Sequence, residues 1–171
     1  MLRRITNLYK RFFWNPIRYA RSIGVKVGEG CSFGSVSFGT EPYLVEIGNH
    51  VQLTSDVKFF THGAAWVYRL KEPEFDVFGK IRIKNNVYVG NNVLFLPGVV
   101  IESNCIIGAG SVVTKSVPEG KIIGGNPAKI IGDVQEYYKK ASPFNINTKS
   151  LSLVKKRAVI ENLENNNFIQ K

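Results

Sequence analysis

The chain of 171 residues contains two histidines, His50 and His62. Histidine is the side chain best suited to take up a proton near neutral pH, so both are candidate general bases. His50 stands in IGNHVQ at a position typical of turns, and we interpret it as a solvated corner. His62 stands where a regular pattern gives way to a long irregular stretch, and long loops in compact domains are commonly functional. His62 is therefore the stronger candidate for a catalytic base.

An imidazole that acts as a base usually needs a partner on its other ring nitrogen, which orients the ring. Asp56 lies six residues before His62, which would place the two at similar corners of a repeating structure. Glu72, Glu74 and Asp76 follow in the irregular stretch. The sequence does not rank these four carboxylates, so the partner of His62 stays open.

The pattern that surrounds His62 is a six-residue repeat. From Ile83 to Pro118 the chain divides into six hexads, whose first residue is always large and apolar and whose fifth is small or β-branched. Turn-forming residues fill the positions between them. A period of six fits neither a helix nor an alternating strand, and short antiparallel strands would not need a fixed phase. The repeat predicts a solenoid of short parallel strands with a corner every six residues.

The repeat is interrupted twice upstream. Hexads begin at Val27, and the segment Gly39–Glu46 holds a two-residue insertion before they resume at Ile47. The second interruption, Ala65–Arg82, has no hexad phase. We expect a loop over residues 65–80 that protrudes from the coil.

The two ends of the chain are predicted to be helical. Residues 1–22 place apolar side chains at helical spacing and basic side chains on most of the other face, which predicts an amphipathic helix. Such a helix packs against the protein or rests on an anionic membrane, and both alternatives stay open. Residues 133–171 predict a helical tail, with Asp133 and Ser150 as caps. The repeat itself spans residues 23–132.

The composition is that of an ordinary globular domain, with 44% hydrophobic and 21% charged residues and a formal net charge of +10. A basic excess suits phosphate-bearing ligands or anionic surfaces, but no helix-turn-helix, zinc or RNP motif indicates nucleic-acid binding. Cys31 and Cys105 give no disulfide framework and no metal-ligand spacing, so we interpret both as small buried residues. Because no long apolar run or secretory signal is present, we expect a cytoplasmic protein.

Four segments together resemble the hexapeptide-repeat acyltransferases, among them the galactoside, maltose and serine acetyltransferases and the sugar acetyltransferases of capsule and O-antigen synthesis. They are the hexad ladder, FFTHGAAWVYR, IIGAGSVVTKSVP and GGNPAKII. The resemblance covers roughly Val25 to Gly132. It departs at Gly63, where polysaccharide-type members usually have Asp.

This resemblance implies an all-β solenoid, namely a left-handed parallel β-helix that is active as a homotrimer with sites between adjacent subunits. It implies direct transfer of an acetyl group from acetyl-CoA to a hydroxyl or amine, without an acyl-enzyme and without a metal. The metal-dependent hexad enzymes need three histidines per site, and this chain has two.

The resemblance also assigns roles to residues. His62 becomes the general base, and Asp56, Asp76, Asn85 and Trp66 become candidates for orienting the base or contacting the substrate. Small residues would lie beneath the pantetheine arm of CoA, and lysines would meet its phosphates, although the small residues also suit a tight corner. The predicted CoA-binding residues are Gly108, Ala109, Gly110, Ser111, Thr114, Lys115, Asn126, Pro127 and Lys129.

We therefore expect an acetyl-CoA-dependent acetyltransferase that modifies a sugar, or a lipid-linked sugar, in surface polysaccharide synthesis. O- and N-transfer stay open, because the base does the same work for both. Residues 1–21 leave open a peripheral contact with the inner face of the membrane. The alternative is a non-catalytic trimeric scaffold, which would have no need of the GAGSVVTK and GNPAK segments.

Overall fold

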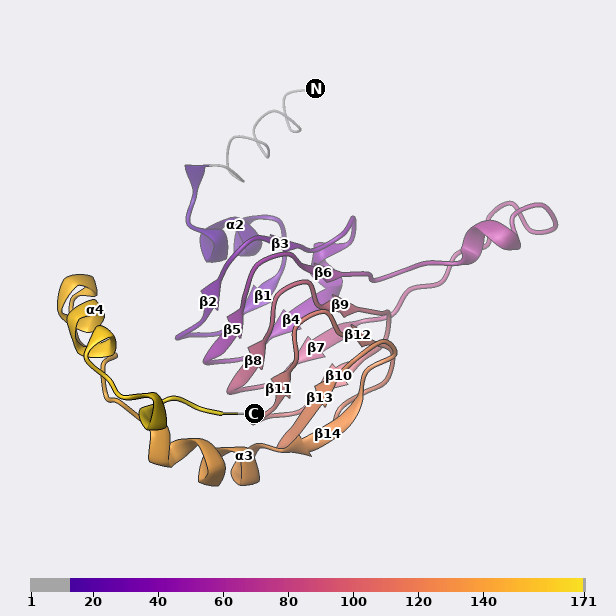
Figure 1. Ribbon diagram of the computed structural model, residues 1–171. Coiled ribbons are helices and arrows are strands. Elements are labelled where there is room, and N and C mark those ends of the chain that lie inside the picture. Colours follow the sequence, from indigo (N-terminus) through magenta and orange to yellow (C-terminus); the bar gives the residue numbers. More distant parts are fainter. Residues whose placement is uncertain (1–12, 171) are drawn as a thin grey trace. The chain divides into compact units, whose positions relative to one another are not determined.

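The structure is a computed structural model that describes residues 13–170. Its strands form three faces of a prism, wound as successive coils (Figure 1). The first face contains β1 (Lys26–Val27), β4 (Val45–Ile47), β7 (Ile81–Ile83) and β10 (Val100–Ile101). The second contains β2 (Ser32–Phe33), β5 (Val51–Leu53), β8 (Val87–Val89), β11 (Ile106–Ile107), β13 (Lys121–Gly124) and β14 (Lys129–Asp133). The third contains β3 (Val36–Ser37), β6 (Val57–Phe59), β9 (Leu94–Phe95) and β12 (Val112–Val113).

The strands pair in parallel, except for the antiparallel hairpin of β13 and β14. The register places the first residues of equivalent hexads in successive coils opposite one another, as with Leu53 and Val89 or Phe59 and Phe95. These side chains point inward and are buried, and the rings of Phe38, Phe59 and Phe95 stack at centroid distances of 5.3 and 5.0 Å. Each buried side chain of this size contributes about 1.5–3 kcal/mol. The predicted solenoid is confirmed.

Asparagines close the first corner, which leads from the first face to the second. Asn86 and Asn104 have positive φ angles of 55° and 60°, in the left-handed region that Asn tolerates. His50 has the same conformation one coil earlier, and its Nδ1 lies 2.8 Å from Asn86 Oδ1. Asn85 Oδ1 accepts a hydrogen bond from the backbone N–H of Asn49 at 2.8 Å, which ties two coils together. His50 is thus a corner residue, as the sequence predicts.

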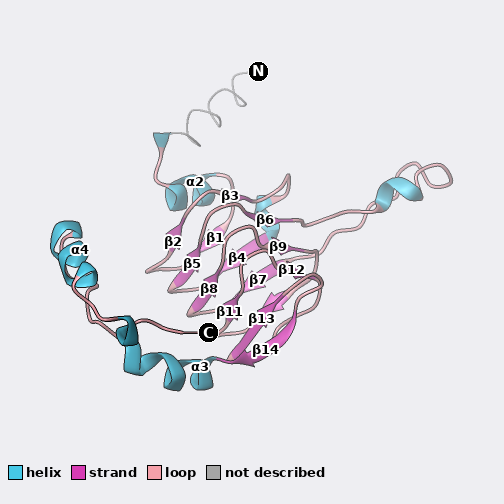
Figure 2. Ribbon diagram, in the orientation of Figure 1, coloured by secondary structure: helices cyan, strands magenta, loops and turns pink. Residues whose placement is uncertain are grey.

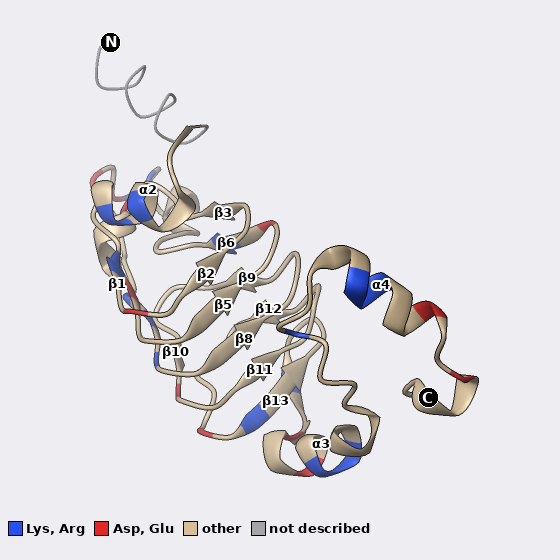
Figure 3. Ribbon diagram, turned by 90° about the vertical axis from the view of Figure 1, so that its left-hand side faces the viewer, with Lys and Arg blue, Asp and Glu red and all other residues tan. Residues whose placement is uncertain are grey.

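The first helix described is α2 (Pro16–Ser22), which contacts β1 and β2. Asn15 caps it, because its side-chain oxygen accepts a hydrogen bond from the Ile17 N–H at 2.9 Å. Ala20 is fully buried and anchors the helix on the prism. Most of the helix predicted over residues 1–22 lies outside the described residues. Figure 3 marks Lys and Arg positions on the ribbon of α2 in blue.

Residues 135–170 belong to a compact unit of their own. The helix α3 (Val134–Ala141) begins directly after Asp133, and α4 (Leu153–Glu161) follows (Figure 2). The predicted cap Ser150 is wrong, because the Ser152 side chain accepts the hydrogen bond from the Lys155 N–H. Ser150 and Ser152 lie two positions apart, and both are residues that commonly cap a helix, so the sequence does not distinguish between them. Short 3-10 helices occupy Pro42–Leu44 (η1), Ala65–Val67 (η2), Ser142–Phe144 (η3) and Asn165–Asn167 (η4).

Candidate active site

The candidate site lies at the third corner of the prism, which leads from the third face back to the first. The strands of the third face are ordered β12, β9, β6, β3, so the segments that follow them are stacked in the same order. Backbone bonds join them, from Phe60 N to Phe95 O at 2.9 Å and from Leu96 N to Val113 O at 3.0 Å. Segments far apart in sequence are therefore stacked along this corner. From the first coil onward they contain Glu41, then His62, then Leu96–Gly98, and then Thr114 and Lys115.

His62 is paired with Glu41. Its Nδ1 lies 2.7 Å from Glu41 Oε2, and the buried Thr61 hydroxyl donates to the same carboxylate oxygen at 2.7 Å. Because an ionised carboxylate only accepts hydrogen bonds, Nδ1 of His62 must carry a proton. In the neutral ring, Nε2 is then unprotonated and can accept a proton. The His62 side chain is 41% exposed and that of Glu41 16%, so the imidazole is accessible and the carboxylate is sheltered.

The two interruptions of the repeat lie at the same corner and position Glu41 and His62. The insertion in Gly39–Glu46 widens the first coil at the third corner and ends in η1, with Glu41 as its N-cap residue. The second interruption begins at the same corner one coil later, directly after His62. The base of that loop is held by a bridge between His62 and Phe78 and by a bond from Gly79 N to Thr61 O at 2.8 Å.

Glu41 is held in its ionised form. Its burial alone would raise the pKa of the carboxyl group, but hydrogen bonds from Thr61, Thr40 and His62, together with the charge of a protonated His62, outweigh this effect. The pKa of Glu41 therefore lies below its ordinary value of 4.5. A carboxylate that stays ionised can stabilise an imidazolium on His62 during proton transfer.

The residues proposed from the sequence as partners of His62 lie elsewhere. Asp56 is at the second corner, between the second and third faces, where its Oδ1 accepts a hydrogen bond from the Ser35 hydroxyl at 2.8 Å. Asp76 lies in the loop, 3.5 Å from the Arg69 guanidinium. Asn85 lies at the first corner, where its Oδ1 accepts the hydrogen bond from the Asn49 N–H. Glu41 is the carboxylate that the sequence analysis missed, and the signal for it was the insertion that surrounds it.

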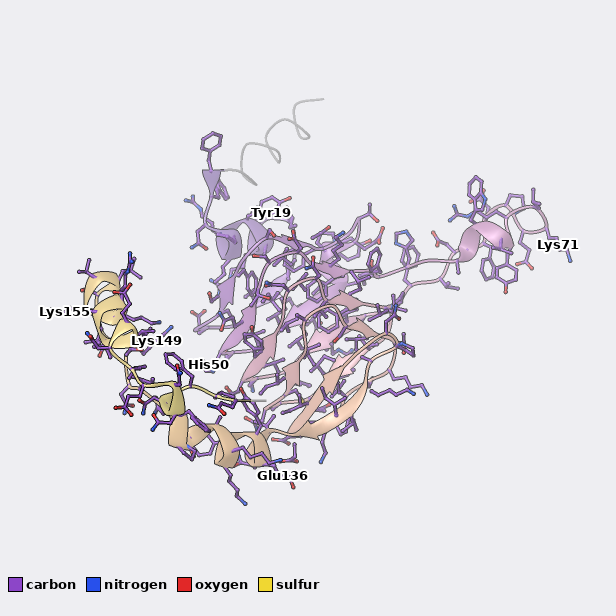
Figure 4. The ribbon with its side chains drawn as sticks, viewed as in Figure 1. Tyr19, His50, Lys71, Glu136, Lys149 and Lys155 are labelled. Atoms are coloured by element: carbon purple, nitrogen blue, oxygen red, sulfur yellow. The ribbon has the colours of Figure 1, made fainter. Side chains whose placement is uncertain are left out.

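The loop after His62 protrudes from the prism, as predicted, with Lys71 at its tip (Figures 1 and 4). It has a small core of its own, in which the rings of Tyr68 and Phe75 lie 5.0 Å apart. Arg69 Nε donates to the Phe75 carbonyl oxygen at 3.1 Å. Trp66, which the resemblance marks as a possible substrate contact, lies in η2 with 81% of its surface exposed.

A cavity of about 590 Å³ lies beside His62. It extends along the third corner from the base of the loop to the next coil. Its lining residues are Phe60, His62, Gly63, Ala64, Val77, Phe78, Gly79, Leu96, Pro97 and Gly98. A substrate held here has access to the imidazole.

Comparisons with known proteins identify the family. A family model described as bacterial transferase hexapeptide (six repeats) matches residues 80–115. Protein CapG of Staphylococcus aureus is 50% identical over 146 residues, which cover 83% of this chain and 85% of that protein. The chain belongs to the hexapeptide-repeat transferases.

Further matches agree on the type of enzyme. Galactoside O-acetyltransferase of Escherichia coli (strain K12) is 34% identical over 121 residues, which cover 71% of this chain and 60% of that protein. The solved structure of a galactoside acetyltransferase in complex with coenzyme A has a TM-score of 0.58 and 26% identity, with 81% of this chain and 82% of that chain covered. This hexapeptide-repeat protein is an acetyltransferase, and its solenoid is the left-handed β-helix that the resemblance implied.

The predicted CoA-binding residues of this hexapeptide-repeat enzyme fall on both sides of β12. Gly108–Ser111 form the second corner before it, and Thr114 and Lys115 begin the third corner after it. Ser111 is fully buried and its hydroxyl donates to the Gly108 carbonyl oxygen at 2.5 Å, so that hydroxyl closes the corner and does not face a ligand. The other small residues, Ala109 and Gly110, are exposed.

The GNPAK segment runs beside the same strand. The Val112 N–H donates to the Gly125 carbonyl oxygen at 3.0 Å, and the Ala128 N–H donates to the Val112 carbonyl oxygen at 2.9 Å. The peptide bond between Asn126 and Pro127 is cis, and Lys129 is exposed. The two segments that carried the resemblance thus meet around β12.

Within residues 13–170, no group of three or more His, Cys, Asp or Glu side chains is arranged to hold a metal ion. The same part of the chain contains no helix long and apolar enough to cross a bilayer.

Proposed function

We propose that this hexapeptide-repeat protein transfers an acetyl group from acetyl-CoA to a hydroxyl or amine of a sugar, with His62 as the general base. The hydrogen bond of 2.7 Å between His62 Nδ1 and Glu41 Oε2 carries this proposal, because it leaves Nε2 as the proton acceptor beside the cavity. The sugar class is supported by the similarity to galactoside O-acetyltransferase, and a role in surface polysaccharide synthesis by the similarity to CapG.

The reaction is a direct transfer. His62 Nε2 takes the proton of the acceptor as the acceptor oxygen or nitrogen attacks the thioester carbon. The new bond to that carbon forms, the bond from carbon to sulfur breaks, and the imidazolium returns the proton to the departing thiolate. Glu41 is a positioning residue, since it touches the base and not the substrates. It holds the ring in its productive tautomer and stabilises the imidazolium.

The donor would bind along β12. Ala109 and Gly110 leave the backbone open on one side of this strand, and Thr114 and Lys115 lie on the other. The exposed ammonium groups of Lys115 and Lys129 suit the phosphates of CoA, at about 1 kcal/mol or less each.

The assembly and its place in the cell belong to the same proposal. We infer a homotrimer that acts in the cytoplasm and has its sites between subunits. Sedimentation equilibrium tests the oligomeric state. A peripheral membrane contact through residues 1–21 is supported by six basic residues without an acid in that segment. Removing residues 1–21 should then abolish flotation with anionic liposomes, and equal flotation of both proteins would refute the contact.

The activity is tested with acetyl-CoA and a panel of nucleotide sugars and oligosaccharides, with thiol release as the readout. His62→Ala should lower turnover at least about 100-fold with the oligomer intact, because the base is lost. His50→Ala is the matched control, since His50 is bonded to Asn86 at the first corner. Unchanged turnover in His62→Ala would remove His62 from the base role. Absence of calorimetric binding of acetyl-CoA would reject the enzyme function and favour a scaffold.

A further inference from the structure

The cavity beside His62 has a chemical character that the transfer of an acetyl group to a sugar does not require. Its large side chains are apolar, namely Phe60, Val77, Phe78, Leu96 and Pro97. Apart from the imidazole of His62, the lining side chains carry no hydrogen-bonding group. A sugar ring needs several hydrogen-bond partners, whereas walls of this kind favour a hydrocarbon group.

The position of the cavity assigns it to the donor. Along the third corner, Glu41 lies one coil before His62, while Leu96–Gly98 lie one coil after it. The next segment in that direction contains Thr114 and Lys115, the predicted CoA contacts. The cavity therefore begins at the base and extends toward the donor, where the acyl carbon has to lie.

Gly63 keeps this cavity open and apolar. A Cβ atom added at Gly63 would meet no atom within 4 Å, and the backbone there is not in the left-handed region that restricts side chains. A side chain at this position would therefore project into free space beside His62. As a glycine, residue 63 adds neither charge nor side-chain volume to the lining of the cavity.

We propose that the cavity is an acyl pocket, and that the enzyme binds donors with acyl chains longer than acetyl, from propionyl to hexanoyl. An acetyl group places only one methyl in a pocket of about 590 Å³, so most of that space is left for a longer acyl chain. The inference rests on the proposed function. The chemistry is the same, because the longer chain changes only the group attached to the carbonyl carbon, and CoA leaves as the thiol.

The test compares CoA, acetyl-CoA, propionyl-CoA, butyryl-CoA and hexanoyl-CoA by isothermal titration calorimetry on the full chain, so that no acceptor is needed. Each buried methylene should tighten binding about fourfold, which gives roughly tenfold or more between acetyl-CoA and butyryl-CoA. Equal dissociation constants for acetyl-CoA and butyryl-CoA, or weaker binding of butyryl-CoA, would overturn the acyl pocket and leave the acetyltransferase function standing. Absence of binding by every donor would reject the function itself.

Substitutions at Gly63 test whether the acyl chain binds in this cavity. Gly63→Leu fills the pocket and should reduce the preference for butyryl-CoA over acetyl-CoA at least about tenfold. Gly63→Ala adds a single methyl, so its preference for butyryl-CoA over acetyl-CoA should lie between those of the native chain and Gly63→Leu. Gly63→Asp should also reduce the preference, because the carboxylate makes the pocket polar. A butyryl preference that stays the same in folded Gly63→Leu and Gly63→Asp would show that the acyl chain binds elsewhere, and would overturn the assignment of this cavity.

Discussion

At the scale of single residues, the site depends on one short contact between side chains 21 positions apart. Glu41 Oε2 receives hydrogen bonds from both Thr61 and His62, so the carboxylate is fixed from two sides. The proton on His62 Nδ1 is thereby fixed as well, and Nε2 is left as the ring nitrogen that can accept a proton. A histidine without this partner would still be a base, but it would rotate and lose the productive tautomer for part of the time.

Replacing the carboxylate tests this argument. Glu41→Gln should lower kcat about 10- to 100-fold with little change in the KM for acetyl-CoA, because the imidazolium loses its stabilising charge and the donor site is untouched. The acid limb of the profile of kcat against pH should also move to lower pH. Glu41→Asp, which keeps the charge, should recover part of the activity. A fall in kcat with the same pH profile in Glu41→Gln would indicate a merely structural role.

The lowered pKa of Glu41 also makes a prediction about stability. A carboxyl group whose pKa is lower in the folded state stabilises the fold above its ordinary pKa, and this contribution is lost as the pH falls through the folded value. The difference in Tm between the native chain and Glu41→Gln should therefore be full at pH 7 and shrink progressively below about pH 4.5. Thermal melts at several pH values measure it. A difference that grows as the pH falls would contradict the assignment.

At the scale of elements, a three-residue strand turns two side chains inward, such as Val87 and Val89 in β8, and the inward side chains of successive coils stack. Phe95 lies fully buried in β9, with the ring of Phe59 at 5.0 Å. Tyr88 in β8 is also aromatic, but it points outward and is 43% exposed. Substituting each of these two residues therefore distinguishes the contribution of inward packing from the general preference of aromatic residues for strands.

Phe95→Ala should lower the free energy of unfolding by about 3–5 kcal/mol, because it leaves a cavity in the stack of rings. Tyr88→Ala, the matched control, should cost less than about 1 kcal/mol. Urea denaturation of both variants gives the comparison. Similar losses for the two substitutions would mean that the faces of the prism are not divided into inside and outside as described.

At the scale of the whole molecule, a solenoid brings distant segments together without long-range loops. The proposed donor site would combine Thr114 and Lys115 with the turn at Asn126 and Pro127, because both segments flank β12. Glu41 and His62, the proposed catalytic pair, come from two consecutive coils. One corner can therefore carry the proposed base, the proposed acyl pocket and the first proposed donor contacts in order along the axis of the coils.

The charge on the donor side can be tested separately from the base. Lys115→Ala should raise the KM for acetyl-CoA about two- to fivefold and leave kcat unchanged, with a smaller effect at high salt. Lys71→Ala, at the tip of the loop (Figure 4), removes the same charge outside the proposed donor groove and is the control. A change in kcat without a change in KM for Lys115→Ala would place this lysine near the reacting atoms instead.

The sequence by itself determined the solenoid and the protruding loop, because a period of six and a break in that period are local signals. The same break favoured His62 over His50 as the candidate base. The sequence left the partner of His62 open among four carboxylates, and Glu41 was not one of them. Only the tertiary structure decided that pair, because the extra residues in Gly39–Glu46 have an effect that depends on which corner they widen. Once the coils are in register, that corner is the one from which His62 projects, and a separation of 21 residues becomes 2.7 Å.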